Sequence, residues 1–170
     1  MSDFDRAFEI IIGNEGGYQN NPLDRGNWTG GQIDKGELRG TKYGISAAAY
    51  PRLNIQSLSV NDAKLIYKRD YWDAAKCEQY PYHVSLQVFD AAVNHGVSRA
   101  ILMLQEALDV KVDGVVGPIT IGSAIKCEAG WFKARFNGVR LSFYTDLSEV
   151  QWATFGKGWA RRVSKNLMEH

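Results

Sequence analysis

Apolar residues recur at three- and four-residue steps along most of the chain, which is the period of helices with one buried face. The first stripe opens behind a capping Ser2 and comprises Phe4, Ala7, Phe8, Ile11 and Ile12. Glu15 continues this stripe three residues after Ile12, and we expect Gly16 and Gly17 to end the helix. Further helices are predicted over 59–71, 85–94 and 98–108, in a long segment around 132–147, and in a last segment that carries Trp159, Val163 and Leu167.

Residues 16–45 lack such a period and are rich in Gly, Asn and Asp, which predicts loops with short strands. The expected fold class is therefore α+β, predominantly helical, with a small β element near residues 18–45. Four tryptophans that lie within or beside the predicted helices are expected in the core: Trp72, Trp131, Trp152 and Trp159.

The composition limits the classes of function. With 170 residues, 45% of them hydrophobic, the chain can form one compact domain or a domain with a small appendage. Its net charge of +1 does not fit a dedicated nucleic-acid binder. The positive charge gathers near the C-terminus, so we expect its basic last helix to contact an anionic partner such as lipopolysaccharide. A solvated helix face is the simpler interpretation of the same charges.

Neither a metal nor another cofactor is predicted. The three histidines, at 83, 95 and 170, form no zinc-binding motif, and the two cysteines, Cys77 and Cys127, are expected to be reduced and mostly buried. A Cys-His peptidase would need one of these thiols beside His83 or His95. The first residues are acidic where a signal peptide is basic, so we expect synthesis in a cytoplasm without a signal peptide.

Glu15 is the strongest candidate for chemistry. Hydrolysis of a glycosidic bond needs a carboxylic acid that stays protonated near neutral pH. Burial on an apolar stripe and the negative end of a helix dipole would both raise the pKa of Glu15. Gly16 and Gly17 would leave room beside it for a sugar chain. The alternative is a glutamate at a frayed helix end that faces solvent.

The segments NEGGYQNNPLDRGNWTGG (14–31) and GTKYGIS (40–46) resemble the phage-endolysin muramidases of glycoside hydrolase family 108. This resemblance implies a lysozyme-like fold and places the catalytic glutamate at Glu15. The order Glu, eight residues, Asp, then Thr before Gly-Ile also resembles phage T4-type lysozymes, in which the Asp and Thr position the water. That likeness implies Asp24 and Thr41 as helpers, with Tyr43-Gly44-Ile45 expected as the strand that carries Thr41.

Several alternatives stay open for these helpers. An insertion separates Asp24 from Thr41, so that Asp34 and Glu37 are rival second carboxylates and Thr29 is a rival hydroxyl. Asp24 after Pro22 is equally typical of an Asx turn. If water attacks from the face opposite the acid, the two carboxyl groups should lie roughly 6.5 to 9.5 Å apart, against roughly 5 to 5.5 Å for a covalent route.

Sugar-binding residues are expected among aromatic side chains of the loop region, because sugars stack on such rings: Tyr18, Trp28 and Tyr43. VFDAAVNHG (88–96) resembles the cleft-lining helix of the same family, which implies that Asp90 and Asn94 bind sugar hydroxyls. A plain helix end at Asn-His-Gly is an equal interpretation.

From about Ser98 onward the chain resembles the helical peptidoglycan-binding segment of this family, through stretches such as DGVVGPIT (113–120). We therefore expect a catalytic domain over 1–97 and a binding segment over 98–170. The implied function is an endolysin that cleaves the β-1,4 bond between N-acetylmuramic acid and N-acetylglucosamine of peptidoglycan, as a monomer that reaches the periplasm through a holin-type lesion. A lytic transglycosylase and a non-catalytic wall-binding protein are the alternatives.

Overall fold

The structure is a computed structural model that describes residues 1–13 and 16–169. The chain forms two compact units, Met1–Arg69 and Asp70–His170. The predicted fold class is confirmed: helices dominate, and the described strands form one two-stranded sheet. The predicted division into domains 1–97 and 98–170 stays a prediction. None of the described helices combines the length and the apolar content that crossing a bilayer requires.

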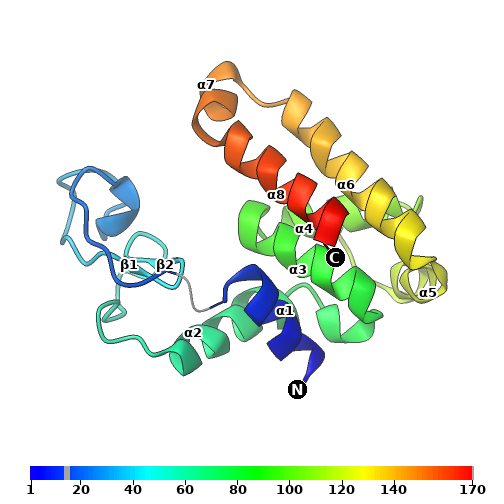
Figure 1. Ribbon diagram of the computed structural model, residues 1–170, viewed down its shortest axis with the longest axis horizontal. Coiled ribbons are helices and arrows are strands. Elements are labelled where there is room, and N and C mark those ends of the chain that lie inside the picture. Colours follow the sequence, from blue (N-terminus) through cyan, green and yellow to red (C-terminus); the bar gives the residue numbers. More distant parts are fainter. Residues whose placement is uncertain (14–15, 170) are drawn as a thin grey trace. The chain divides into compact units, whose positions relative to one another are not determined.

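In the first unit, helix α1 (Asp3–Ile11) packs against helix α2 (Val60–Tyr67) (Figure 1). Capping boxes at Ser2 and Ser59 start the two helices. The ring of Phe8 on α1 meets that of Tyr67 on α2 edge to face, with the ring centres 5.7 Å apart. Lys64 on α2 adds ion pairs of 3.4 and 3.1 Å to the α1 acids Asp5 and Glu9.

Helix α1 ends earlier than the sequence predicted. Gly13 takes a positive φ of 59°, and the backbone N–H groups of Ile12 and Gly13 both donate to the carbonyl of Phe8. This glycine stops the helix, so the prediction that the helix runs on to Gly16 and Gly17 is wrong.

The β element is a tight hairpin of strands β1 (Thr41–Lys42) and β2 (Ile45–Ser46). Tyr43 and Gly44 form its two-residue turn with φ values of 52° and 75°, as a type I′ turn requires at both positions. Tyr43 and Gly44 are therefore turn rather than strand, while Thr41 is on a strand as expected. The hydroxyl of Tyr67 on α2 donates to the carbonyl of Tyr43 (3.0 Å) and holds the turn in place.

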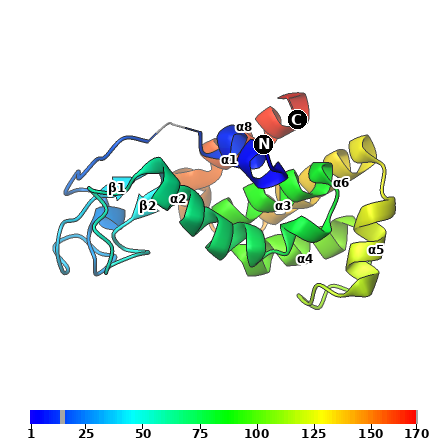
Figure 2. The same ribbon diagram turned by 90° about the horizontal axis from the view of Figure 1, so that it is seen from below.

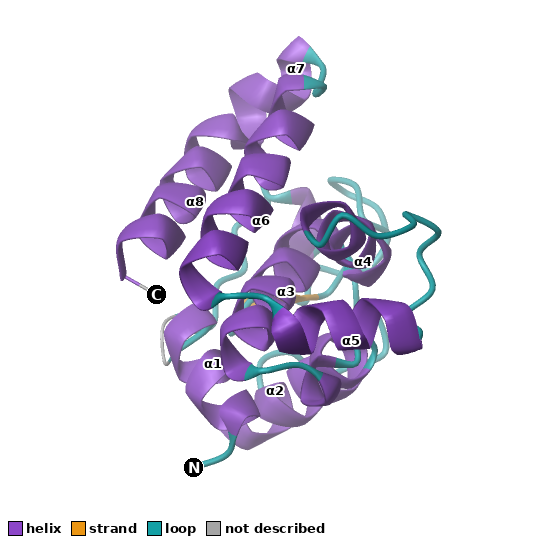
Figure 3. Cartoon of the chain, turned by 90° about the vertical axis from the view of Figure 1, so that its right-hand side faces the viewer, coloured by secondary structure: helices purple, strands orange, loops and turns teal. Residues whose placement is uncertain are grey.

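The second unit is a helical bundle around α3 (Tyr82–His95), whose residues 84–92 are all buried. α3 packs on α4 (Val97–Ala107) and α6 (Ala129–Thr145). Figure 2 shows α5 (Pro118–Lys126) at one end of these helices. In Figure 3, α6 and α8 (Lys157–Glu169) run side by side, joined through the short α7 (Glu149–Gln151).

Irregular turns complete the described elements: a 3₁₀ turn at Arg25–Asn27, another at Cys77–Gln79, and π-helical segments at Lys68–Asp73 and Trp152–Gly156. The tryptophans that were expected in the core differ in their burial. Trp72 is fully buried, whereas Trp131 and Trp152 are each 46% exposed, so placing these two in the core was wrong. Trp131 lies instead under the guanidinium of Arg135, 5.6 Å from the ring centre.

Candidate active site

Glu15, the predicted acid, lies outside the described residues. The next described residue is Gly16, whose carbonyl accepts the N–H of Tyr43 (2.7 Å). Gln19 then pairs with Thr41 through two backbone hydrogen bonds of 2.9 and 2.8 Å. Residues 16–19 are therefore hydrogen-bonded to the hairpin that carries the predicted helper Thr41 on strand β1.

Asn27 is the centre of a polar network beside this bridge and is fully buried. Its amide oxygen accepts the hydroxyl of Thr41 (2.7 Å) and the amide of Gln19 (3.1 Å). Its amide nitrogen donates to the side-chain oxygen of Gln19 (2.8 Å) and to the carbonyl of Asn21 (2.9 Å). All the hydrogen-bonding positions of the Asn27 amide are thus used, and the side chain fixes Thr41 against the loop.

Asp24 joins the same network through Gln19, whose amide donates to Asp24 Oδ2 (3.3 Å). Oδ1 of Asp24 accepts the N–H of Gly26 (2.8 Å), which makes Asp24 the cap of the 3₁₀ turn. The Asx-turn interpretation therefore describes its local geometry. The carboxylate is nevertheless exposed, and two hydrogen bonds leave acceptor capacity for a water molecule. A catalytic role of Asp24 stays a prediction.

The rival residues of the insertion lie elsewhere in the loop. The hydroxyl oxygen of Thr29 accepts a hydrogen bond from the backbone N–H of Glu37 (2.9 Å), which joins the two ends of the insertion. Glu37 is exposed and pairs with Arg39 (2.6 Å), and Asp34 is an exposed turn residue with φ of 61°. Of the two threonines, Thr41 shares hydrogen-bond partners with Asp24.

The network residues Gln19 and Asn27 were missed by sequence reasoning. Both belong to the quoted segment, but nothing in its pattern indicates that an asparagine in a polar loop is buried. Its partners Gln19 and Thr41 lie 8 and 14 residues away.

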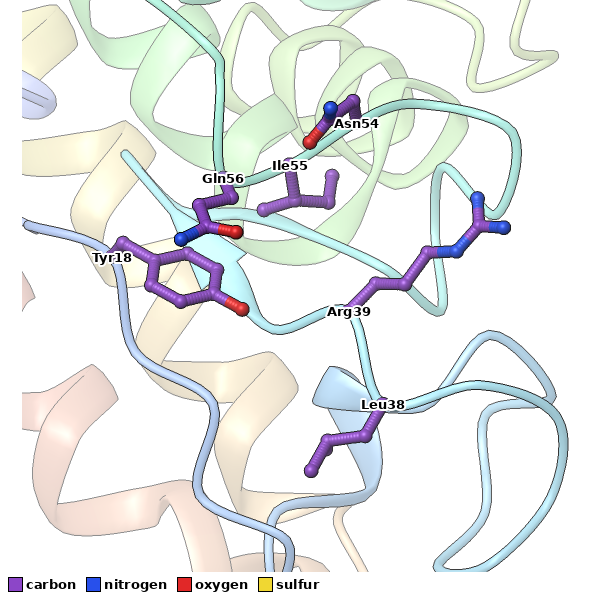
Figure 4. Close-up of a pocket in the computed structure, with 6 residues that line it drawn as sticks. All are labelled: Tyr18, Leu38, Arg39, Asn54, Ile55 and Gln56. Atoms are coloured by element: carbon purple, nitrogen blue, oxygen red, sulfur yellow. The ribbon is translucent and has the colours of Figure 1, made fainter.

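The three predicted sugar-stacking residues have different surroundings. Trp28 is partly exposed, and its indole N–H donates to the carbonyl of Pro22 (2.9 Å). Tyr43 is partly exposed on the hairpin turn, where Lys42 Nζ lies 5.4 Å from its ring centre. Tyr18 lines a pocket of about 370 Å³ together with Leu38, Arg39, Asn54, Ile55 and Gln56 (Figure 4).

Asp90 and Asn94 belong to a network inside the second unit. Asp90 is 2% exposed, and its carboxylate accepts hydrogen bonds from Arg140 (2.6 Å), Arg162 (2.6 Å) and Asn166 (2.8 Å). Burial alone would raise the pKa of Asp90, but the Arg140 and Arg162 guanidinium groups hold it below its usual value. Asn94 donates to the Asp90 carbonyl (2.8 Å) and accepts from Arg162 (2.8 Å). This geometry gives both residues structural partners, and sugar binding by them stays a prediction.

One cysteine does lie beside a histidine. Cys127 Sγ is 3.7 Å from His83 Nε2, but the thiol donates to the carbonyl of Ala124 (3.1 Å) and burial raises its pKa. A cysteine nucleophile needs a lowered pKa, so this pair lacks the activated thiol of a peptidase. Within residues 1–13 and 16–169, no three His, Cys, Asp or Glu side chains are grouped to hold a metal ion.

Known proteins resemble this chain in sequence and in fold. The profile of the family described as Glycosyl hydrolase 108 matches residues 8–96, and that of a predicted peptidoglycan domain matches residues 99–164. No curated protein sequence matches the chain. Among solved structures, SagA of Brucella abortus is similar, with 30% sequence identity and a TM-score of 0.76 over 96% of this chain and 91% of that one. The fold is lysozyme-like, peptidoglycan is the partner, and the chain belongs to the glycosyl hydrolase 108 family.

Proposed function

We propose that the protein is a muramidase, which hydrolyses the β-1,4 bond between N-acetylmuramic acid and N-acetylglucosamine of peptidoglycan. Membership of a glycosidase family supports hydrolysis of a glycosidic bond, and the attached peptidoglycan domain supports the substrate. The observation that carries the proposal is the network in which Gln19 and Asn27 join Asp24 to Thr41. It gathers a carboxylate and a hydroxyl, the two groups that can hold an attacking water.

In this mechanism Glu15 donates a proton to the glycosidic oxygen as the bond to the anomeric carbon breaks. Asp24 accepts a proton from the water that attacks this carbon, and the Thr41 oxygen positions the water. Asp24 is suited to that step because Gln19 and Gly26 hold its two oxygens in fixed directions. We expect the carboxyl groups of Glu15 and Asp24 to lie roughly 6.5 to 9.5 Å apart, the spacing of inverting glycosidases.

Product analysis tests the proposal. Purified Gram-negative peptidoglycan is digested with the wild type and with Glu15→Gln, and the products are identified by mass spectrometry. We expect reducing muramic acid ends from the wild type alone. Products lighter by one water, the 1,6-anhydro form, would establish a lytic transglycosylase, which lets the muramic 6-hydroxyl attack and does not need Asp24. Equal activity of the two proteins would mean that Glu15 is not the acid.

We propose a role in lysis of a bacterial host cell, with action on the wall in the periplasm after release through a holin-type membrane lesion. The joined glycosidase and peptidoglycan domains support an enzyme that attacks the wall. Expression in a Gram-negative bacterium with and without a holin tests this role. Lysis only with the holin is expected, and lysis in neither culture would contradict it.

We also propose that α8 contacts lipopolysaccharide. Lys157, Arg161 and Lys165 are exposed at four-residue steps along α8, so they form one basic stripe. Lys157→Glu with Arg161→Glu should weaken binding to lipopolysaccharide micelles and should do so less at high salt. Lys126→Glu on α5, which is also exposed, is the control for a charge reversal outside α8. Equal binding by the double variant and the wild type would contradict the contact.

A further inference from the structure

The pocket around Tyr18 lies on the side of the hairpin away from the Asn27 network. Side chains of successive residues in extended backbone point to opposite faces. Gln19 and Thr41 form the bridge and both direct their side chains to Asn27. Their neighbours Tyr18 and Lys42 therefore face the other way, and Lys42 Nζ reaches the carbonyl of Gln56 in the pocket wall (3.0 Å).

The lining of this pocket matches the chemistry of an N-acetylated sugar. Tyr18 offers an aromatic ring, Asn54 and Gln56 offer amides, and Leu38 offers apolar surface. Sugars pair stacked C–H faces with a few polar groups in this way. An acetamido group adds a hydrogen-bond donor and acceptor, which can pair with side-chain amides, and a methyl group, which can pack on apolar side chains. The volume of about 370 Å³ falls in the range of about 300 to 1,000 Å³ of ligand pockets.

The polar groups of the pocket have capacity to bind a ligand. Among the residues that the structure describes, none hydrogen-bonds the hydroxyl of Tyr18 or the side-chain amide of Gln56. Figure 4 shows the ring of Tyr18 beside that amide. Arg39 is different, because Glu37 (2.6 Å) and the carbonyl of Pro51 (3.0 Å) occupy its guanidinium. The Tyr18 hydroxyl and the Gln56 amide are neutral, and Glu37 balances the charge of Arg39, which together favour an uncharged sugar over an acidic peptide.

The walls of the pocket are held in place before any ligand binds. Gly40 has φ of 80°, and a Cβ there would collide with the Tyr18 ring and the Gln19 carbonyl, so the ring lies directly on the glycine backbone. Ile55 is 1% exposed and anchors the segment that carries Asn54 and Gln56. A preorganised wall loses little conformational entropy when a ligand binds.

We propose that this pocket is a second glycan-binding site, which takes one N-acetylhexosamine unit of a wall strand on the side of the hairpin opposite Asp24 and Thr41. The identity of the sugar rests on the proposed function. Such a site would hold the enzyme on its polymeric substrate between cleavage events, because a second contact on the same polymer raises its effective concentration.

Titration of N,N′,N″,N‴-tetraacetylchitotetraose into isotopically labelled Glu15→Gln protein tests the site by NMR. We expect saturable shifts at Tyr18, Asn54 and Gln56, including the side-chain amide signals of Gln56. Gln56→Ala should weaken this binding about three- to tenfold, the effect of one lost hydrogen bond. Gln32→Ala, at an exposed position outside the pocket, should leave this binding unchanged. Tyr18→Phe removes the hydroxyl and keeps the ring, so it measures the contribution of the hydroxyl alone.

Two results would overturn the second site: shifts confined to the loop around Asp24 and Thr41, or equal affinity of Gln56→Ala and its parent. Wall hydrolysis by the wild type, measured in parallel, keeps the two proposals apart. Hydrolysis without a response at the pocket overturns the second site alone. A response at the pocket without hydrolysis overturns the muramidase proposal alone.

Discussion

Thr41 donates a hydrogen bond of 2.7 Å to the amide oxygen of Asn27, a side chain with no exposed surface. Asn27 in turn exchanges hydrogen bonds with Gln19, which reaches Asp24. One buried amide therefore sets the positions of two predicted catalytic groups that lie 17 residues apart in the sequence. Asn27 is therefore the structural centre of the predicted site.

Replacement of this centre should affect stability and activity together. Asn27→Ala leaves the Thr41 hydroxyl and the Gln19 amide without their partner, which should lower the free energy of unfolding by about 1 to 3 kcal/mol. It should also reduce the rate of wall hydrolysis, since Asp24 and Thr41 lose their common support. Urea unfolding and a peptidoglycan turbidity assay measure the two effects. Asn20→Ala, at an exposed neighbouring position, is the control, and matching behaviour of the two variants would contradict the role of Asn27.

The hydroxyl of Thr41 should matter for the chemical step. Thr41→Val keeps the shape of the side chain but removes the oxygen that positions the water, so we expect kcat to fall by about a hundredfold. Thr41→Ser restores the hydroxyl and should recover most of the activity. Thr29→Val, at the rival threonine, should lower stability through its lost contact with the Glu37 backbone and change kcat little. A larger loss of kcat in Thr29→Val than in Thr41→Val would reverse the assignment.

Periodicity predicted most of the helices, because a buried face must repeat with the helical period. The pattern around Leu86 and Phe89, for example, identified α3. It failed at the end of α1, where the apolar run continues to Ile12 but Gly13 takes a left-handed conformation that only local geometry reveals. The small β element was located, but Tyr43, expected on a strand, lies in its turn with a positive φ that is uncommon for an aromatic residue.

Buried polar side chains were the harder part of the prediction. Asp90 is an acid on a helix of apolar residues, and its partners Arg140 and Arg162 come 50 and 72 residues later. A sequence pattern shows an acid at that position but not the cations that surround it. The same limit applies to Asn27, whose burial follows from the packing of the loop. Polar residues at such positions are identified by their partners, which only the folded chain brings together.

Asp90→Asn tests whether the ion network has the structural role that its geometry indicates. The change leaves Arg140 and Arg162 without a buried countercharge and should cost about 3 to 5 kcal/mol in unfolding free energy. Asp109→Asn removes an exposed partner of Arg135 and should change stability by less than about 1 kcal/mol. An equally stable Asp90→Asn protein with weakened sugar binding would instead support the cleft-lining role.

The same network predicts sensitivity to strong acid. The pKa of Asp90 in the folded protein is below the value of about 3.9 in the unfolded chain, so its stabilisation is complete above about pH 4. It is lost as pH falls through the folded-state pKa. The wild type should therefore lose stability steeply below about pH 4, and Asp90→Asn should show a shallower slope in that range. Unfolding curves at several acidic pH values measure the difference.

His95 should give the protein a second pH dependence in a milder range. Its ring lies among Phe143, Tyr144 and Trp159, with Nε2 3.1 Å from the Tyr144 hydroxyl. Burial lowers the pKa of His95 to about 4, and the guanidinium groups of Arg140, Arg162 and Arg99 act in the same direction, against the Asp90 carboxylate. Since the unfolded value is about 6.5, protons bind the unfolded chain more readily than the folded one.

The stabilisation from His95 is therefore complete above about pH 6.5 and is lost as pH falls from 6.5 through the folded-state pKa. His95→Phe keeps an aromatic ring in the cluster and removes the titrating group, so its stability should change less than that of the wild type over this range. Asp90→Asn should retain this mild dependence, which separates the two groups. A His95 ring signal that titrates near pH 6.5 in the NMR spectrum of the folded wild type would contradict the buried, neutral imidazole.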